Sequence, residues 1–133
     1  MHLDKRGAGN LTYLLAERIV KSDGLGPHVE LEEGKALDVT LGIESVPQQE
    51  ALVVSISGSQ DGVEWGDRPL ITFTPKSYCG TYRKLLNLSK FPGVRYFRAE
   101  WKMQRWTKSK RPMEFAFYVL AQEADCRTSS AVA

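Results

Sequence analysis

Apolar residues recur at every second position along most of this chain, which is the spacing of a β-strand with one buried face. The clearest run places on one face Leu37, Val39, Leu41 and Ile43. Similar runs occupy residues 52–57, 71–74, 81–88, 97–103 and 114–121. Turn-forming residues separate the runs, and no long helical pattern interrupts them. We therefore expect an all-β protein, an antiparallel two-sheet β-sandwich of the jelly-roll kind with about seven or eight strands.

The last two runs carry the most aromatic residues and define the expected core. One of them places on a single face Phe97, Ala99, Trp101 and Met103. The other aligns on one side Phe115, Phe117, Val119 and Ala121. Its second side also holds apolar residues, Ala116, Tyr118 and Leu120, so this strand is expected to be covered on both faces.

Two segments near the start of the chain are less regular. Residues 11–20 fit either a strand or a helix, and a strand is favoured because the later segments are β and no helix-capping box precedes it. A short strand is also expected at 28–31. The proline-containing segment at 45–50 joins two alternating runs, which we expect to form an antiparallel pair.

The length of 133 residues is enough for one domain and too short for two well-packed ones. Residues 1–10 and 122–133 show no apolar periodicity, so both ends are expected to be flexible tails around a β-sandwich domain at 11–121. There is no apolar run of 18 residues and no apolar leader at the start. These features favour a soluble protein with a cytoplasmic location and no membrane partner.

The balance of basic and acidic residues indicates whether nucleic acid is an expected partner. Lysine and arginine number 18 against 16 acidic residues, giving a formal net charge of +2. A protein dedicated to nucleic acid needs a larger excess of cations to neutralise phosphates, so nucleic acid is not an expected partner.

Motifs that carry catalysis are missing from the sequence. Neither of the two histidines neighbours a nucleophile, and there is no G-x-S-x-G, H-E-x-x-H or phosphate-binding glycine loop. Two cysteines and two scattered histidines cannot form a zinc pattern. We expect no enzyme activity, no catalytic residue, no metal and no cofactor. Whether carboxylates converge in space on a metal or catalytic site is left open.

The string SISGSQDGVEW at 55–65 is the most informative local motif. Asp61 and Gly62 form a step typical of a tight hairpin, because glycine takes the positive φ that such a turn requires. Trp65 follows, where its ring either packs over the end of the sandwich or stacks on the ring of a sugar.

A basic string, KMQRWTKSKRP at 102–112, lies between the last two expected strands and is expected to form a hairpin tip. It holds five cations and no acid. Such a tip either binds phosphates or keeps a strand edge soluble. Together with the turn at 55–65, it supplies the candidate ligand-binding residues, which are Trp65, Arg105, Trp106, Lys108 and Lys110.

Several short strings together resemble a known family. The segments SGSQDGVEW, ITF, VRYFRAEW and FAFYVLA resemble small β-sandwich proteins of phage and prophage virion gene clusters, over about residues 12–121. An S-x-DG-x-x-W turn with an R-Y-x-R strand is also similar to discoidin-type carbohydrate-binding jelly rolls, although the terminal disulfide pair of those domains is missing here.

The first resemblance implies a non-enzymatic structural or assembly module of prophage origin, with protein partners or self-association and, as the alternative to a cytoplasmic location, association with a virion. The second implies the alternative function, a carbohydrate-binding module that presents aromatic residues on its end loops to a glycan.

Overall fold

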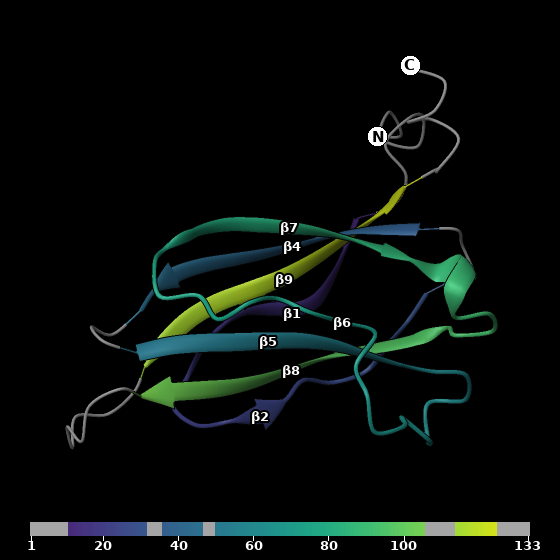
Figure 1. Ribbon diagram of the computed structural model, residues 1–133, viewed down its shortest axis with the longest axis horizontal. Helices are drawn as coiled ribbons and strands as arrows, with labels where there is room; N and C mark the ends of the chain where they lie inside the picture. The colour runs from purple at the N-terminus through teal and green to yellow at the C-terminus, as the bar shows by residue number, and fades with distance from the viewer. Residues whose placement is uncertain (1–10, 32–35, 47–49, 106–113, 125–133) are drawn as a thin grey trace, which may run out of the picture.

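The chain forms two antiparallel sheets packed face to face (Figure 1). The computed structural model describes residues 11–31, 36–46, 50–105 and 114–124. The strands are β1 (Leu11–Val20), β2 (Gly24–Leu25), β3 (Val29–Glu30), β4 (Ala36–Ser45), β5 (Glu50–Ser59), β6 (Ile71–Thr72), β7 (Gly80–Asn87), β8 (Tyr96–Arg105) and β9 (Phe115–Ala124). A 3-10 turn, η2 (Leu88–Lys90), follows β7. The predicted all-β sandwich is confirmed, with nine strands, of which β2, β3 and β6 have two residues each.

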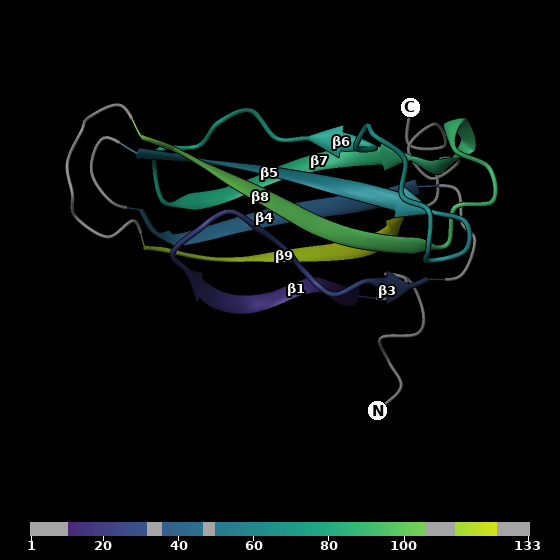
Figure 2. The same cartoon turned by 90° about the horizontal axis from the view of Figure 1, so that it is seen from below.

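The two sheets draw on strands that are distant in the sequence. One sheet has four strands in the order β1-β9-β4-β7. The other has five, in the order β2-β8-β5-β6, with β3 also paired to β8. Figure 1 separates the two layers, with β4, β9 and β1 in the upper one and β5 and β8 in the lower one, and Figure 2 looks through the sandwich with β5 and β8 in front of β4 and β9.

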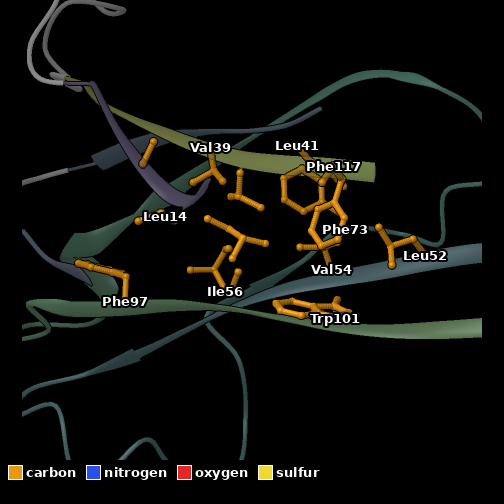
Figure 3. Packing of buried hydrophobic residues seen from close by; sticks show 14 of the residues in the cluster. Leu14, Val39, Leu41, Leu52, Val54, Ile56, Phe73, Phe97, Trp101 and Phe117 are labelled. Atoms are coloured by element: carbon orange, nitrogen blue, oxygen red, sulfur yellow. The ribbon is translucent and has the colours of Figure 1, made fainter. Parts of the chain in front are cut away.

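The core between the sheets is built from the alternating positions that the sequence singled out (Figure 3). The inward side chains of β4, β5, β8 and β9 are buried, and they include Leu41, Val54, Phe97 and Phe117. Trp101 of β8 meets Phe117 of β9 across the core, with ring centroids 5.6 Å apart in an edge-to-face arrangement. Met103, at the end of the same alternation, is half-buried and packs against this core.

The segment at 11–20 is a strand, as favoured, and the short strand near 28–31 is present as β3. At the other end of the chain, β9 runs to Ala124, three residues past the expected end of the domain. These last residues pair with β4, where Ala36 lies opposite Ala124. Pairing to a central strand therefore extends β9 beyond its apolar alternation.

The expected antiparallel pair of β4 and β5 is wrong. The neighbours of β4 are β9 and β7, whereas β5 lies between β8 and β6 in the other sheet. The connection between Ser45 and Glu50 therefore crosses from one sheet to the other. Both strands have one apolar face, and placing them in opposite sheets buries those faces against the same core. Nothing in the local sequence distinguishes that solution from a hairpin.

The expected hairpin between β8 and β9 is wrong for the same reason. These strands belong to different sheets, so they are not the two arms of a hairpin. The expectation that β9 is covered on both faces is also wrong. Among the described residues, no element lies over its outer side, where Ala116, Tyr118 and Leu120 are half-buried.

Candidate binding surfaces

The turn that follows β5 is fixed by its own side chains. The Ser59 hydroxyl accepts from the backbone N–H groups of Asp61 (3.2 Å) and Gly62 (2.9 Å) and donates to Asp61 Oδ1 (3.0 Å). Asp61 Oδ1 also accepts from the backbone N–H groups of Val63 (2.9 Å) and Glu64 (3.0 Å). Gly62 has a φ of +79°, the positive value predicted for this step. The turn opens a long loop to β6, however, and not a tight hairpin.

This network predicts how Asp61 responds to acid. The backbone N–H of Glu64, then that of Val63, and then the Ser59 hydroxyl stabilise the carboxylate and hold the pKa of Asp61 below its ordinary value. A lowered pKa adds stability above the unfolded-state pKa, and that contribution is lost as pH falls through the folded-state pKa.

Asp61→Asn keeps an acceptor and cannot titrate. Relative to wild type, it should therefore lose less stability between about pH 5 and about pH 2. Urea unfolding midpoints measured across this range test the prediction, and parallel pH profiles for the two proteins would contradict it.

Trp65 does not close the end of the sandwich. Its ring lies over the outer face of the five-stranded sheet, with the Arg98 guanidinium carbon 4.3 Å from the ring centroid. His28 and Tyr96 extend this group, since the His28 ring lies 6.1 Å from Trp65 and 5.7 Å from Tyr96. The buried Nε of Arg98 has no hydrogen-bond acceptor. The contact with the indole is a cation–π interaction that stabilises this arginine.

A shallow depression of about 300 Å³ lies beside this group. Its walls include Ser59, Gln60, Asp61, Glu64 and Trp65. Carboxylates can accept hydrogen bonds from sugar hydroxyls, and an indole N–H can donate one to a sugar oxygen. One face of Trp65 is already occupied by Arg98, however, and only the remaining part of the ring is open to a ligand.

Arg105, another predicted ligand-binding residue, is not brought to Trp65. Arg105 is the last residue of β8, opposite Glu50 of β5. Ser59, at the start of the turn that leads to Trp65, pairs with Tyr96 at the opposite end of β8. Trp106, Lys108 and Lys110 lie outside the described residues, so phosphate binding by the basic segment stays a prediction.

A second surface, which the sequence analysis missed, is the outer face of the four-stranded sheet. We call it the tyrosine face and define it by the outward residues Leu11, Tyr13, Ile19, Thr40, Gly42, Arg83, Leu85, Tyr118 and Leu120. Seven large apolar side chains are strongly exposed in the described part of the chain, and four of them gather here: Leu11, Tyr13, Ile19 and Leu85. Gln122 and Asp38 lie between Leu11 and Leu85, so the face is rich in apolar side chains but not continuously apolar. Exposed apolar side chains on one face are typical of binding surfaces.

Strand register arranges the tyrosine face in rows that cross the sheet. One row runs from β1 to β7 through Tyr13, Leu120, Thr40 and Arg83. The row beside it runs through Leu11, Gln122, Asp38 and Leu85. A third row pairs Tyr118 with Gly42 and Thr81. One signal in the sequence could have revealed this face, namely the apolar residues at both parities of β9.

Tyr118 lies flat over the middle of this face because its neighbour is a glycine. A Cβ added at Gly42 would come within 2.1 Å of the Tyr118 ring, so the phenol occupies the space that any larger residue would fill. Tyr13 meets Tyr118 edge to face, with centroids 6.1 Å apart. The two rings are nearly perpendicular, at 79°, which does not provide the flat pair of rings that a sugar chain would stack on.

Charged groups lie at two places on the tyrosine face. Arg83 of β7 forms an ion pair with Asp38 of β4. At the other end of the strands, Glu17 and Glu44 lie where β1 and β4 pair irregularly with β9. A hydrogen bond with Glu17, followed by desolvation and charge repulsion, raises the pKa of Glu44 above its ordinary value.

The described residues hold no group of three or more histidine, cysteine or carboxylate side chains placed to bind a metal ion. No helix in that part of the chain has the length and apolarity needed to cross a membrane. Comparisons with protein-family models, curated proteins and solved structures found no match to this chain.

Proposed function

We propose that this protein is a non-enzymatic assembly module that binds another protein through the tyrosine face. The observation that supports this most directly is that four exposed large apolar residues lie on one sheet face. Leaving such a patch in water is unfavourable, and covering it with a second apolar surface removes that cost. Because the patch lies on a rigid two-sheet core, little backbone conformational entropy is lost when a partner binds.

The resemblance to virion proteins indicates what kind of partner to test. Assembly modules work through repeated contacts with themselves and with proteins encoded by neighbouring genes. A prophage origin stays a prediction that rests on the motifs at 55–65 and 93–101, and identification of the adjacent genes tests it.

Substitution of the face tests the proposal. Leu85→Asp removes an exposed apolar side chain and places a second carboxylate opposite Asp38, so it should weaken association at least tenfold when a partner buries both charges. Leu25→Asp is the matched control, since Leu25 is 52% exposed against 58% for Leu85 but lies on β2 in the other sheet. Sedimentation of the chain alone, and with the products of adjacent genes, measures the effect. Equal loss in both variants, or no association at all, would overturn the proposal.

Carbohydrate binding at Trp65 is the second candidate. The depression lined by Asp61, Glu64 and Trp65 favours it, because carboxylates bind sugar hydroxyls and an indole packs on a sugar ring. The stacked Arg98 counts against it, since this side chain occupies one face of the ring that a sugar would need. We therefore place it second to assembly.

A further inference from the structure

The free edge of β7 differs from the other edges of the sandwich. β7 is the end strand of its sheet, and in the described part of the chain it pairs with β4 alone (Figure 1). Its eight residues keep one register with β4 from Gly80 to Asn87, without a bulge. The end strand on the other side, β1, has two shifts in register, and the edge strands β2, β3 and β6 of the second sheet have two residues each.

A long, regular edge strand is a template for one more strand. In an antiparallel pair, alternate residues direct their N–H and C=O groups away from the partner. Half of β7 therefore presents these groups on the side where no described strand pairs with it. An extended peptide can bind there by continuing the sheet, through hydrogen bonds from its backbone and contacts from every second side chain.

A depression of about 480 Å³ lies along this edge, and we call it the edge depression. One wall consists of residues 81–84 of β7, and the other consists of Phe73, Thr74 and Lys76 at the edge of the second sheet. Consecutive residues of a strand point to opposite faces of its sheet. A wall that includes four consecutive residues therefore follows the edge of β7 and not one of its faces, which is the place that an added strand would occupy.

The charge of the edge depression favours an acidic partner. Its lining residues include Lys76, Arg83 and Lys84 and no carboxylate. Arg83 forms an ion pair with Asp38, which balances its charge. None of the ion pairs among the described residues involves Lys76 or Lys84, so these two ammonium groups carry the charge that a partner would neutralise.

Neighbouring groups position both lysines at the edge. Lys76 Nζ donates to Thr74 Oγ1 (2.9 Å) and lies 4.4 Å from the centroid of the Tyr82 ring. Lys84 Nζ donates to the Thr72 carbonyl of the other sheet (3.3 Å). An ammonium group has three N–H donors and each lysine uses one here, so both can still donate to a carboxylate.

We infer that the edge of β7 binds an extended acidic segment of another protein, which adds a fifth strand to the four-stranded sheet and directs acidic side chains toward Lys76 and Lys84. This inference goes beyond the proposed function and does not rest on it, because it uses the edge of the sheet and not its outer face. Like charges oppose a second copy as the occupant. Two β7 strands paired antiparallel about the edge depression would bring the Lys84 side chains of both copies together.

Titration with a peptide, followed by nuclear magnetic resonance, tests the site. The probe is a blocked eight-residue peptide, the length of β7, in which glutamate alternates with valine. At fixed ionic strength it should shift the backbone amide signals of Thr74, Lys76 and residues 81–84 in a saturable way. We expect a Kd of about 0.1 to 1 mM, because one added strand buries little area. The same peptide with lysine in place of glutamate should bind at least tenfold more weakly.

Methylation of the peptide nitrogens separates strand addition from charge attraction alone. One form is methylated on its valine nitrogens and the other on its glutamate nitrogens. In an added strand only one of these two sets faces β7. One form should therefore lose at least tenfold in affinity, whereas the other should stay within about threefold of the unmethylated peptide. Charge attraction alone would leave the two forms equal.

Substitution of the lysines tests the charge. The double variant Lys76→Gln with Lys84→Gln keeps hydrogen-bond donors, removes two charges, and should weaken binding of the glutamate peptide at least tenfold. Lys21→Gln with Lys102→Gln is the matched control. It removes the same charge, but Lys21 follows β1 at the opposite edge of the sheet and Lys102 lies on β8. The control should change the affinity less than about threefold, and thermal unfolding confirms that both variants are folded.

Four results would each overturn this inference. They are no saturable shift at the edge of β7, equal affinity for the glutamate and lysine peptides, equal affinity for the two methylated forms, and equal weakening in the two double variants. The proposed function is tested separately, because it depends on Leu85, which does not line the edge depression. A chain that fails to bind the peptide but loses association through Leu85→Asp would refute this inference alone.

Discussion

Trp101→Ala should lower the free energy of unfolding by about 3 to 5 kcal/mol. The indole is 5% exposed, contacts Phe117, and fills the space beside Gly24 so closely that a Cβ there would come within 2.8 Å of it. Its removal leaves a cavity between the two sheets that the strands on both sides cannot collapse to fill. Urea unfolding at neutral pH measures the loss.

Two further variants separate the contributions at this position. Trp101→Phe keeps an aromatic ring but loses the bond from Trp101 Nε1 to the Ser22 carbonyl (2.9 Å), so it should cost less than the alanine variant. Trp65→Ala is the matched control, because Trp65 is half-buried outside the core and should cost less than about 2 kcal/mol. Equal losses for Trp101→Ala and Trp65→Ala would show that the strand register of β8 is wrong.

Phe117→Ala should lower the free energy of unfolding by a similarly large amount. The non-additivity of substitutions at Phe117 and Trp101 measures the contact between the two sheets. The single change should cost about 3 to 5 kcal/mol, because Phe117 is fully buried. Edge-to-face pairs contribute about 0.5 to 1.5 kcal/mol beyond their buried area. The double variant should therefore lose less stability than the sum of the two single losses, by about that amount.

A second pair of variants provides the control for this coupling. Phe97 is also fully buried, and Figure 3 shows it at the other end of the core from Phe117. Changes at these two phenylalanines should add within about 0.5 kcal/mol. Coupling as large as that of Trp101 with Phe117 would mean that unfolding responds to general loosening of the core and not to the cross-sheet contact.

Alternation in the sequence determined which side of each long strand is buried. Leu41, Val54 and Phe97 face the core as predicted, because the side-chain period of a strand is two and only one parity of each strand was continuously apolar. Phe117 faces the core too, although both parities of its strand are apolar. The turn at Ser59–Glu64 also depends only on residues that are close in the sequence. Its hydrogen bonds join residues within five positions of one another, so the residue types alone indicated it.

Local alternation could not predict which strands pair. The predicted pairs of β4 with β5 and β8 with β9 were wrong, because a strand with one apolar face satisfies its backbone equally well beside any antiparallel neighbour. The contact of Trp65 with Arg98 was beyond the sequence for the same reason, since 33 positions separate residues that only the long β5–β6 loop brings together.

The tyrosine face shows this division most clearly. The sequence placed Tyr118 and Leu120 on the second side of the last strand, but it could not say that Tyr13, Gly42 and Arg83 would lie beside them. Those neighbours come from strands up to about a hundred positions away, and the sheet order β1-β9-β4-β7 decides them. Local alternation fixes the faces of strands, whereas a surface for binding is assembled by long-range pairing, which buries the same apolar area in several possible orders.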